Sequence, residues 1–157
     1  MRDIGRPNEN PLMSLFFGKH ENRLDAKGRV SIPASFRAIL KSEPGAIPLV
    51  LCPSHIKGCI EAWAPSAYAE MARAELGKYD RLDAAYDETV SRLFTDAWQL
   101  ETDKEGRIVL PPGALALTGI KDAVAFFGRG DNFHIWEPAA GAAHLAAARA
   151  AVPGGRA

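Results

Sequence analysis

Short alternations of apolar and polar positions run along the chain, and two of them share one local sequence. The first is LDAKGRVSIP, residues 24–33, and the second is TDKEGRIVLP, residues 102–111. Successive side chains of a strand point to opposite faces, so the aliphatic residues are predicted to face a core and Arg29 and Arg107 to face solvent. The aliphatic positions of the two stretches are Val30, Ile32, Ile108 and Leu110.

A four-residue turn opens each stretch, with aspartate first and glycine fourth. This order is typical of a type I turn, and glycine accepts the positive φ that closes a hairpin loop with a bulge. A proline is the fourth residue after each arginine, where it ends the strand and can open a helix. The turn-forming residues are Asp25, Gly28, Asp103 and Gly106.

The likeness between the two stretches extends to the two halves of the chain. Residues 25–38 and 103–116 are identical at five of fourteen positions, and each half ends in Trp-x-Pro. Each half is predicted to contain strand, tight turn, strand, short helix, strand, turn, strand and helix. One half has too little sheet to bury its own apolar face, so two halves are predicted to share one core around a pseudo-twofold axis.

The predicted fold class is therefore α+β, a small β-barrel of two pseudo-symmetric hairpin-and-helix repeats with flanking helices. Apolar periodicity predicts helices over residues 66–76 and 84–94 between the halves, and over 139–148 at the end. The expected organisation has five parts: a disordered extension (1–14, with Met13 as an alternative start), a first module (15–66), a helical connector (67–94), a second module (95–138), and a C-terminal helix with a frayed tail (139–157).

Charge is unevenly distributed in a chain that is neutral as a whole. The 157 residues hold 19 Lys and Arg against 19 Asp and Glu, so a bulk basic footprint is lacking. Residues 1–41 hold eight basic and four acidic side chains, whereas residues 61–105 hold five basic and eleven acidic ones. The basic excess coincides with the first turn, which is compatible with one anion-binding face.

Candidate chemistry other than the turns is sparse. Cys52, His55 and Cys59 offer three potential zinc ligands without a nearby fourth, so we expect no metal and no cofactor. Two cysteines do not form a secreted disulfide framework, which favours the cytoplasm. The sequence contains no phosphate-binding loop and no catalytic motif, and we expect no enzymatic activity.

Three segments together carry a resemblance to a known family. The segment FFGKHENRLDAKGRVSIPASFR, followed by TDKEGRIVLPPGAL and FHIWEP, resembles the MraZ family of bacterial transcriptional regulators, which hold two SpoVT/AbrB-like swapped-hairpin modules in one chain. The resemblance implies binding to double-stranded DNA at promoter direct repeats, ahead of the division and cell-wall gene cluster. It also implies a ring-shaped homo-oligomer, nucleoid association, and neither a membrane partner nor a small-molecule substrate.

The resemblance and the strand pattern together rank the candidate DNA contacts. Arg29 is expected to reach base edges and Lys27 to hold phosphate, ahead of Lys104 and Arg107, with Arg37 as a further contact. The second turn carries Glu105 where the first carries Lys27, so it is less basic.

Two other interpretations of the turns stay open. Each Asp-x3-Arg pair can simply bridge its own turn as a surface ion pair. The protein can also be an oligomeric interaction module or an antitoxin-like partner whose turns bind another protein.

Overall fold

The computed structural model describes residues 11–40 and 45–153, and its elements follow the predicted order. The strands are β1 (Lys19–Arg23), β2 (Arg29–Ser31), β3 (Pro48–Pro53), β4 (Ile60–Trp63), β5 (Trp98–Glu101), β6 (Arg107–Val109), β7 (Ala123–Gly128) and β8 (Phe133–Trp136). The α-helices are α1 (Ala34–Leu40), α2 (Pro65–Leu76), α3 (Ala84–Val90), α4 (Pro112–Thr118) and α5 (Pro138–Ala150). A 3-10 helix, η1 (Pro11–Ser14), and a π-helix, η2 (Ser91–Thr95), complete the set, so the predicted α+β class is confirmed.

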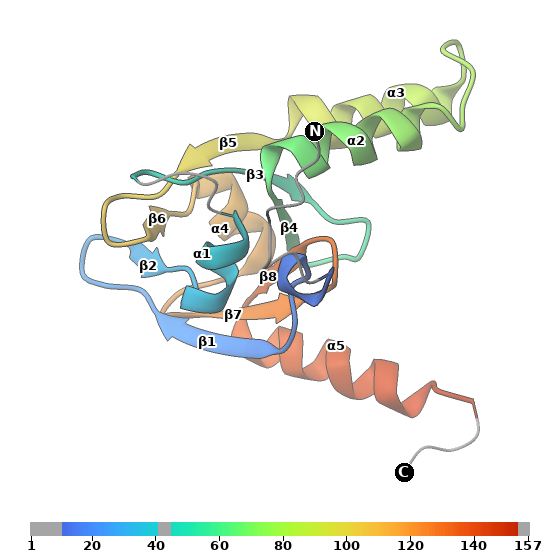
Figure 1. Ribbon diagram of the computed structural model, residues 1–157. Coiled ribbons are helices and arrows are strands. Elements are labelled where there is room, and N and C mark those ends of the chain that lie inside the picture. The colour runs from blue at the N-terminus through green and yellow to red at the C-terminus, as the bar shows by residue number, and fades with distance from the viewer. Residues whose placement is uncertain (1–10, 41–44, 154–157) are drawn as a thin grey trace.

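The strands form a six-stranded antiparallel sheet in the order β1-β7-β8-β4-β3-β5 and a two-stranded sheet of β2 and β6 (Figure 1). Within the described residues the edge strands β1 and β5 are not paired with each other, so the large sheet is open and the predicted barrel is not closed by hydrogen bonds.

The hairpin predicted locally at each turn needs correction, because the strands on either side of each turn belong to different sheets. β1 pairs with β7 and β2 with β6, so each turn carries the chain from the large sheet to the small one. Pairing β2 with the other half buries Val30 and Ile108 together between the sheets, at 1% and 2% exposure.

The registers follow a twofold exchange of the two halves. Exchanging β1 with β5, β7 with β3 and β8 with β4 reproduces the strand order read backwards. Val30 lies opposite Ile108 in one sheet, and Glu61 lies opposite His134 in the other. Each pair consists of residues that hold equivalent places in the two halves, so the pseudo-twofold axis passes through both pairs. The predicted shared core around such an axis therefore agrees with the pairing.

The main core lies between the two sheets and draws on both halves. All four aliphatic residues predicted to face inward are buried, from Ile32 at 0% to Leu110 at 3% exposure. Phe36 of α1 packs against Phe16 and Phe133, with ring centroids 5.2 and 4.8 Å apart. Aromatic burial of this kind supplies much of the hydrophobic stabilisation of a small core.

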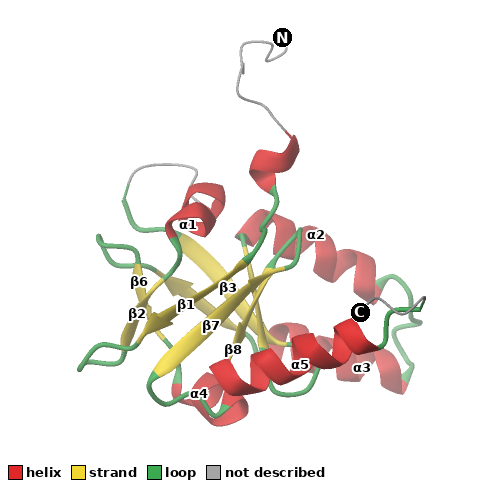
Figure 2. Ribbon diagram, turned by 90° about the horizontal axis from the view of Figure 1, so that it is seen from below, coloured by secondary structure: helices red, strands yellow, loops and turns green. Residues whose placement is uncertain are grey.

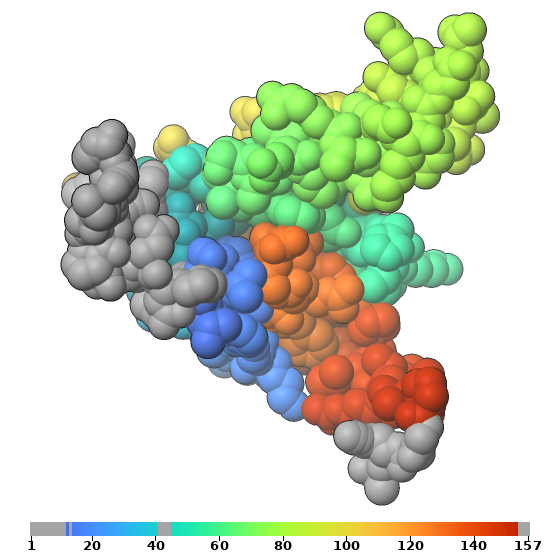
Figure 3. Space-filling model, turned by 45° about the vertical axis from the view of Figure 1, so that its right-hand side comes forward, coloured from blue at the N-terminus to red at the C-terminus, as the bar shows by residue number. Residues whose placement is uncertain are grey.

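The helices α2 and α3 form an arm whose near end packs on β3 and β4, where Tyr68 and Ala72 share a buried cluster with Val50, Cys52 and Trp63. The far end of the arm extends away from the sheets and from α5 (Figures 1 and 3). The Tyr68 hydroxyl donates to the carbonyl of Leu93 and joins α2 to η2. The helix predicted over residues 84–94 ends as η2, in which the N–H of Asp96 donates to the carbonyl of Ser91 at 2.8 Å. This wider turn buries Leu93 but leaves the neighbouring Phe94 54% exposed.

The two ends of the molecule differ in character. The turns before β2 and β6 project from one end, while the α2–α3 arm and α5 extend toward the other (Figures 1 and 2). None of the helices in the two described ranges is long and apolar enough to cross a membrane. Most of the extension predicted over residues 1–14 lies outside the described residues, as do residues 154–157 of the predicted tail.

Candidate nucleic-acid interface

The carboxylate of Asp25 organises the first turn. Its Oδ1 accepts the backbone N–H groups of Lys27 at 2.8 Å and Arg29 at 2.9 Å, and its Oδ2 accepts Nε of Arg29 at 2.7 Å. The backbone closes the same loop, because the N–H of Gly28 donates to the carbonyl of Asp25 at 3.0 Å. One aspartate thus fixes both the loop backbone and the direction of the arginine.

The second turn repeats this geometry. Oδ1 of Asp103 accepts the N–H groups of Glu105 and Arg107, both at 2.9 Å, and Oδ2 accepts Nε of Arg107 at 2.8 Å. The backbone N–H of Arg29, followed by its side chain, lowers the pKa of Asp25 to about 2. The equivalent hydrogen bond from Arg107 lowers the pKa of Asp103. Both carboxylates are therefore ionised at neutral pH.

The ion pair predicted as the local alternative is thus present in both turns, but it does not use all of each guanidinium. Asp25 accepts a side-chain hydrogen bond only from Nε of Arg29. Among the described residues, the two terminal nitrogens of Arg29 have no hydrogen-bond or ion-pair partner. The Arg29 side chain is 31% exposed and that of Arg107 28%. Both lie on the outer face of the β2–β6 ribbon, which consists of Arg29, Ser31, Arg107 and Val109. The predicted strand parity is therefore confirmed.

The second arginine is more heavily neutralised than the first. Nη2 of Arg107 donates to Oε1 of Glu105 at 3.1 Å, and its Nη1 lies 3.9 Å from Oδ2 of Asp25. Asp103, then Glu105 and Asp25, raise the pKa of Arg107. Lys27, which stands where Glu105 stands, is exposed. The first turn thus offers cationic groups to a ligand, and the second turn satisfies its cation internally.

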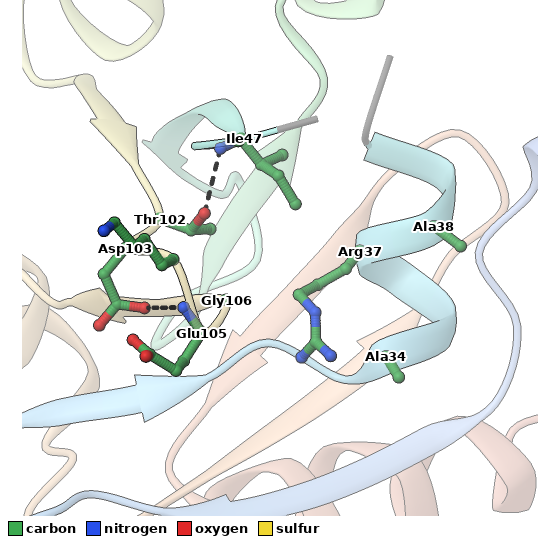
Figure 4. Close-up of a pocket in the computed structure, with 10 residues that line it drawn as sticks. Ala34, Arg37, Ala38, Ile47, Thr102, Asp103, Glu105 and Gly106 are labelled. Atoms are coloured by element: carbon green, nitrogen blue, oxygen red, sulfur yellow. Dashed lines mark hydrogen bonds between the residues drawn. The ribbon is translucent and has the colours of Figure 1, made fainter. Parts of the chain in front are cut away.

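Arg37 lies against the second turn, although it comes from the first half. Its Nη1 donates to the carbonyl of Ile32 at 2.6 Å, and its side chain packs on Gly106. It borders a pocket of ≈310 Å³ between α1 and the second turn, which Lys104 and Glu105 also line (Figure 4). A side chain of the first half, Arg37, therefore packs against the second turn and supports it.

Sequence reasoning missed two polar anchors near the turns. Oγ1 of Thr102 accepts the N–H of Ile47 at 3.0 Å, which ties the second turn to the start of β3 (Figure 4). Nδ2 of Asn22 donates to the carbonyl of Ser31 at 2.7 Å and links β1 to β2. Both are polar residues beside a strand, and only the pairing of distant segments shows their roles.

Two of the three potential zinc ligands, Cys52 and His55, approach the same carboxylate, since Nδ1 of His55 lies 3.8 Å from Oε2 of Glu61. Sγ of Cys52 lies 3.6 Å from Oε1 of Glu61, and Sγ of Cys59 lies 3.5 Å from Nδ1 of His134. The described residues contain no group of three or more His, Cys, Asp or Glu side chains that could hold a metal ion. Burial raises the thiol pKa to about 12 for Cys52 and about 11 for Cys59, so both are protonated at neutral pH.

Known proteins are similar to this sequence along most of its length. The family model described as "MraZ protein, putative antitoxin-like" matches residues 15–84. A protein of Gluconobacter oxydans named transcriptional regulator MraZ is 48% identical over 139 residues, which cover 87% of this chain and 84% of its own. The chain belongs to the MraZ family. Relatives of the same name from Gluconacetobacter diazotrophicus and Parvibaculum lavamentivorans are 45% and 37% identical, covering 87% and 92% of this chain and 87% and 89% of theirs. The family resemblance predicted from the turns and the closing Trp-x-Pro is thus confirmed.

Proposed function

We propose that this protein is a sequence-specific DNA-binding transcriptional regulator that acts on promoter direct repeats, ahead of the division and cell-wall gene cluster. The observation that carries the proposal is the Asp25–Arg29 contact, which aims a guanidinium outward while leaving its terminal nitrogens available. The name of the MraZ relatives supports a role in transcription.

The ribbon has the shape and chemistry for the major groove. A two-stranded antiparallel ribbon fits this groove, where arginine can donate two hydrogen bonds to O6 and N7 of guanine. Because Asp25 holds Nε at 2.7 Å, the side chain is already ordered before DNA arrives, which lowers the entropic cost of the contact. Lys27 lies exposed at the loop tip, where it can hold a backbone phosphate.

The second turn contributes less to this interface. Glu105 and Asp103 accept hydrogen bonds from Arg107, and Glu105 adds a negative charge beside the groove-facing surface. We therefore place Arg29 and Lys27 first among the DNA contacts, with Lys104 and Arg107 behind them. Arg37 acts on the DNA through the second turn that it braces, or by its own charge at the rim of the pocket.

Assembly into a homo-oligomeric ring supplies the affinity that one neutral subunit lacks. Several first turns that engage successive repeats raise the effective concentration of each contact. In the described part of the chain β1 and β5 are sheet edges with one unpaired side, and such edges are surfaces on which a second copy can associate.

The test is binding of purified protein to the promoter DNA of its own genome in a gel-shift or fluorescence-anisotropy titration. Arg29→Ala should abolish preference for the promoter over scrambled DNA and leave the melting temperature within a few degrees, because losing a bidentate base contact costs roughly 1–3 kcal/mol. If a folded, oligomeric Arg29→Ala protein keeps wild-type affinity and selectivity, the first turn is not the reader.

An antitoxin-like interaction module is the second candidate. The description of the family model favours it, and so does the closure of each Asp–Arg pair within its own turn. A protein of this class would show no salt-dependent preference for promoter DNA, so the same titration separates the two candidates.

A further inference from the structure

The outer face of the β2–β6 ribbon carries one exposed aliphatic side chain among its polar ones. Val109 is 56% exposed and lies opposite Arg29 in the register, so both side chains are on the same face. Its counterpart in the other half is Ser31, which lies opposite Arg107. The twofold backbone thus presents an Arg–Val pair at one end of the ribbon and a Ser–Arg pair at the other.

We propose that Val109 is a specificity-determining residue that contacts the C5-methyl group of a thymine close to the base read by Arg29. This inference rests on the DNA-binding function proposed above. The thymine methyl is the apolar feature of the major-groove edge, and small aliphatic side chains recognise it by contact. Burying one methyl group between Val109 and the base removes apolar surface of both from water.

The register sets the distance between the two contacts. Side chains directly opposite each other on an antiparallel pair have Cβ atoms about 4.5–5.5 Å apart. Successive base pairs are about 3.4 Å apart along the helix axis. Arg29 and Val109 therefore reach bases one or two pairs apart, one by hydrogen bonding and the other by apolar contact.

Charge on this end of the ribbon suits DNA better than it suits an apolar partner. Arg29 lies opposite Val109, Lys27 belongs to the turn that leads into Arg29, and only Asp25 among the first-turn side chains is acidic. A protein partner that covered Val109 would have to desolvate these cations, whereas phosphates on both sides of the groove pair with them. The Ser31 end of the ribbon lacks an aliphatic group. A single subunit therefore contacts the two ends of its DNA site differently, although its backbone is pseudo-twofold symmetric.

The experiment begins with duplexes that the full-length wild-type protein selects from a random pool. The enriched duplex is then synthesised with deoxyuridine in place of each thymine in turn, which removes only the methyl group. We expect one substitution, within two base pairs of a guanine whose replacement abolishes binding, to weaken wild-type binding about fourfold, the value of one buried methyl.

Two variants separate the contact from general effects. Val109→Ser, which copies the side chain of Ser31, should bind the thymine and deoxyuridine duplexes equally. Leu82→Ser is the matched control, because Leu82 is 93% exposed in the loop between α2 and α3. This loop lies at the end of the molecule away from β2 and β6 (Figure 1). It should keep the wild-type difference between the two duplexes.

The outcomes distinguish this inference from the function on which it rests. If no deoxyuridine substitution weakens the wild type, or if Val109→Ser keeps the difference, the Val109 contact is wrong while DNA binding through Arg29 stands. If no duplex is enriched, or if Arg29→Ala binds the selected duplex as the wild type does, the proposed function is wrong, and the inference about Val109 is then wrong as well.

Discussion

The side chain of Arg37 lies directly against Gly106, so that a β-carbon at Gly106 would be 2.6 Å from Nε of the arginine. At the equivalent Gly28, no heavy atom lies within 4 Å of the position of a β-carbon. Both glycines have positive φ, +82° and +78°. The two turns therefore share a backbone but differ in what packs on them.

This difference predicts unequal costs for the same substitution. Gly28→Ala and Gly106→Ala should each lower the free energy of unfolding by about 1–2 kcal/mol, because an L-residue is strained in the left-handed region. Gly106→Ala should lose more, because Arg37 must leave its place and give up its hydrogen bond to the carbonyl of Ile32. Urea denaturation followed by circular dichroism measures both losses.

A double-mutant cycle isolates the contribution of Arg37. In an Arg37→Ala background, Gly106→Ala should cost about as much as Gly28→Ala, because only the backbone strain is left. Equal costs of the two glycine substitutions in the wild-type background would show that Arg37 does not brace the second turn.

Acid should destabilise the first turn in a defined pH range. The pKa of Asp25 is lowered to about 2 from 3.8 by the backbone N–H and side chain of Arg29. A depressed carboxyl pKa stabilises the folded state above the unfolded pKa, and this contribution disappears as pH falls from about 4 to about 2. Asp25→Asn should remove that part of the acid dependence, whereas Asp131→Asn, at an exposed site outside both turns, should not. Thermal melts from pH 5 to pH 2 measure it, and identical acid profiles for the wild type and Asp25→Asn would contradict the prediction.

His134 predicts a second and separate pH dependence. Burial, with Arg129 and the other histidines near it, lowers the pKa of His134 from 6.5 to about 3. Between pH 6.5 and pH 3 the unfolded chain binds a proton at His134 more readily than the folded chain does. The free energy of unfolding therefore keeps its full value above pH 6.5 and declines as pH falls toward 3. At pH 5 the loss should be about 2 kcal/mol, and His134→Gln should abolish it. His20→Gln, at an exposed histidine that is not among the groups acting on His134, is the control. Urea unfolding at pH 7.5 and pH 5 tests this, and a wild-type free energy equal at both values would refute it.

The two loop-tip lysines should differ in their effect on DNA binding. Lys27 stands beside a guanidinium with free terminal nitrogens, whereas Lys104 stands beside Glu105, which accepts from Arg107. Lys27→Ala should weaken all duplexes about equally and lower the slope of log K against log salt by about one for each phosphate that the lysine no longer neutralises. Lys104→Ala should change the slope less. Anisotropy titrations between 50 and 200 mM salt supply the slopes, and a larger effect of Lys104→Ala would reverse the assigned order of the two turns.

Strand parity and turn chemistry are local properties, and they were predictable. The alternation of Arg29, Val30 and Ser31 determines which side chains face the core, and Asp25 with Gly28 determines the turn. Val30 is buried at 1% exposure and the turn closes on Asp25, as both patterns indicate. The predicted MraZ resemblance depended on these residues together with the second turn and the closing Trp-x-Pro.

Strand partners are not a local property, and here the hairpin predicted from each turn was wrong, because the strands that flank the turn do not pair with each other. The alternation of apolar and polar residues predicts that β2 has an apolar face, but it does not predict which strand lies beside β2. β2 pairs with β6 because that pairing buries Val30 against Ile108. The contact of Arg37 with Gly106 and the 3.9 Å approach of Arg107 to Asp25 follow from this exchange between halves.

The sequence by itself therefore determined the elements, the turns, the inward faces and the family, because each depends on neighbouring residues or on the order of residues along the chain. Only the tertiary structure decided that Nη1 of Arg107 comes within 3.9 Å of Asp25 in the other turn, and that Val109 lies opposite Arg29. Those relationships join residues from opposite halves of the chain, and they exist because the two halves bury their apolar strands against each other rather than within themselves.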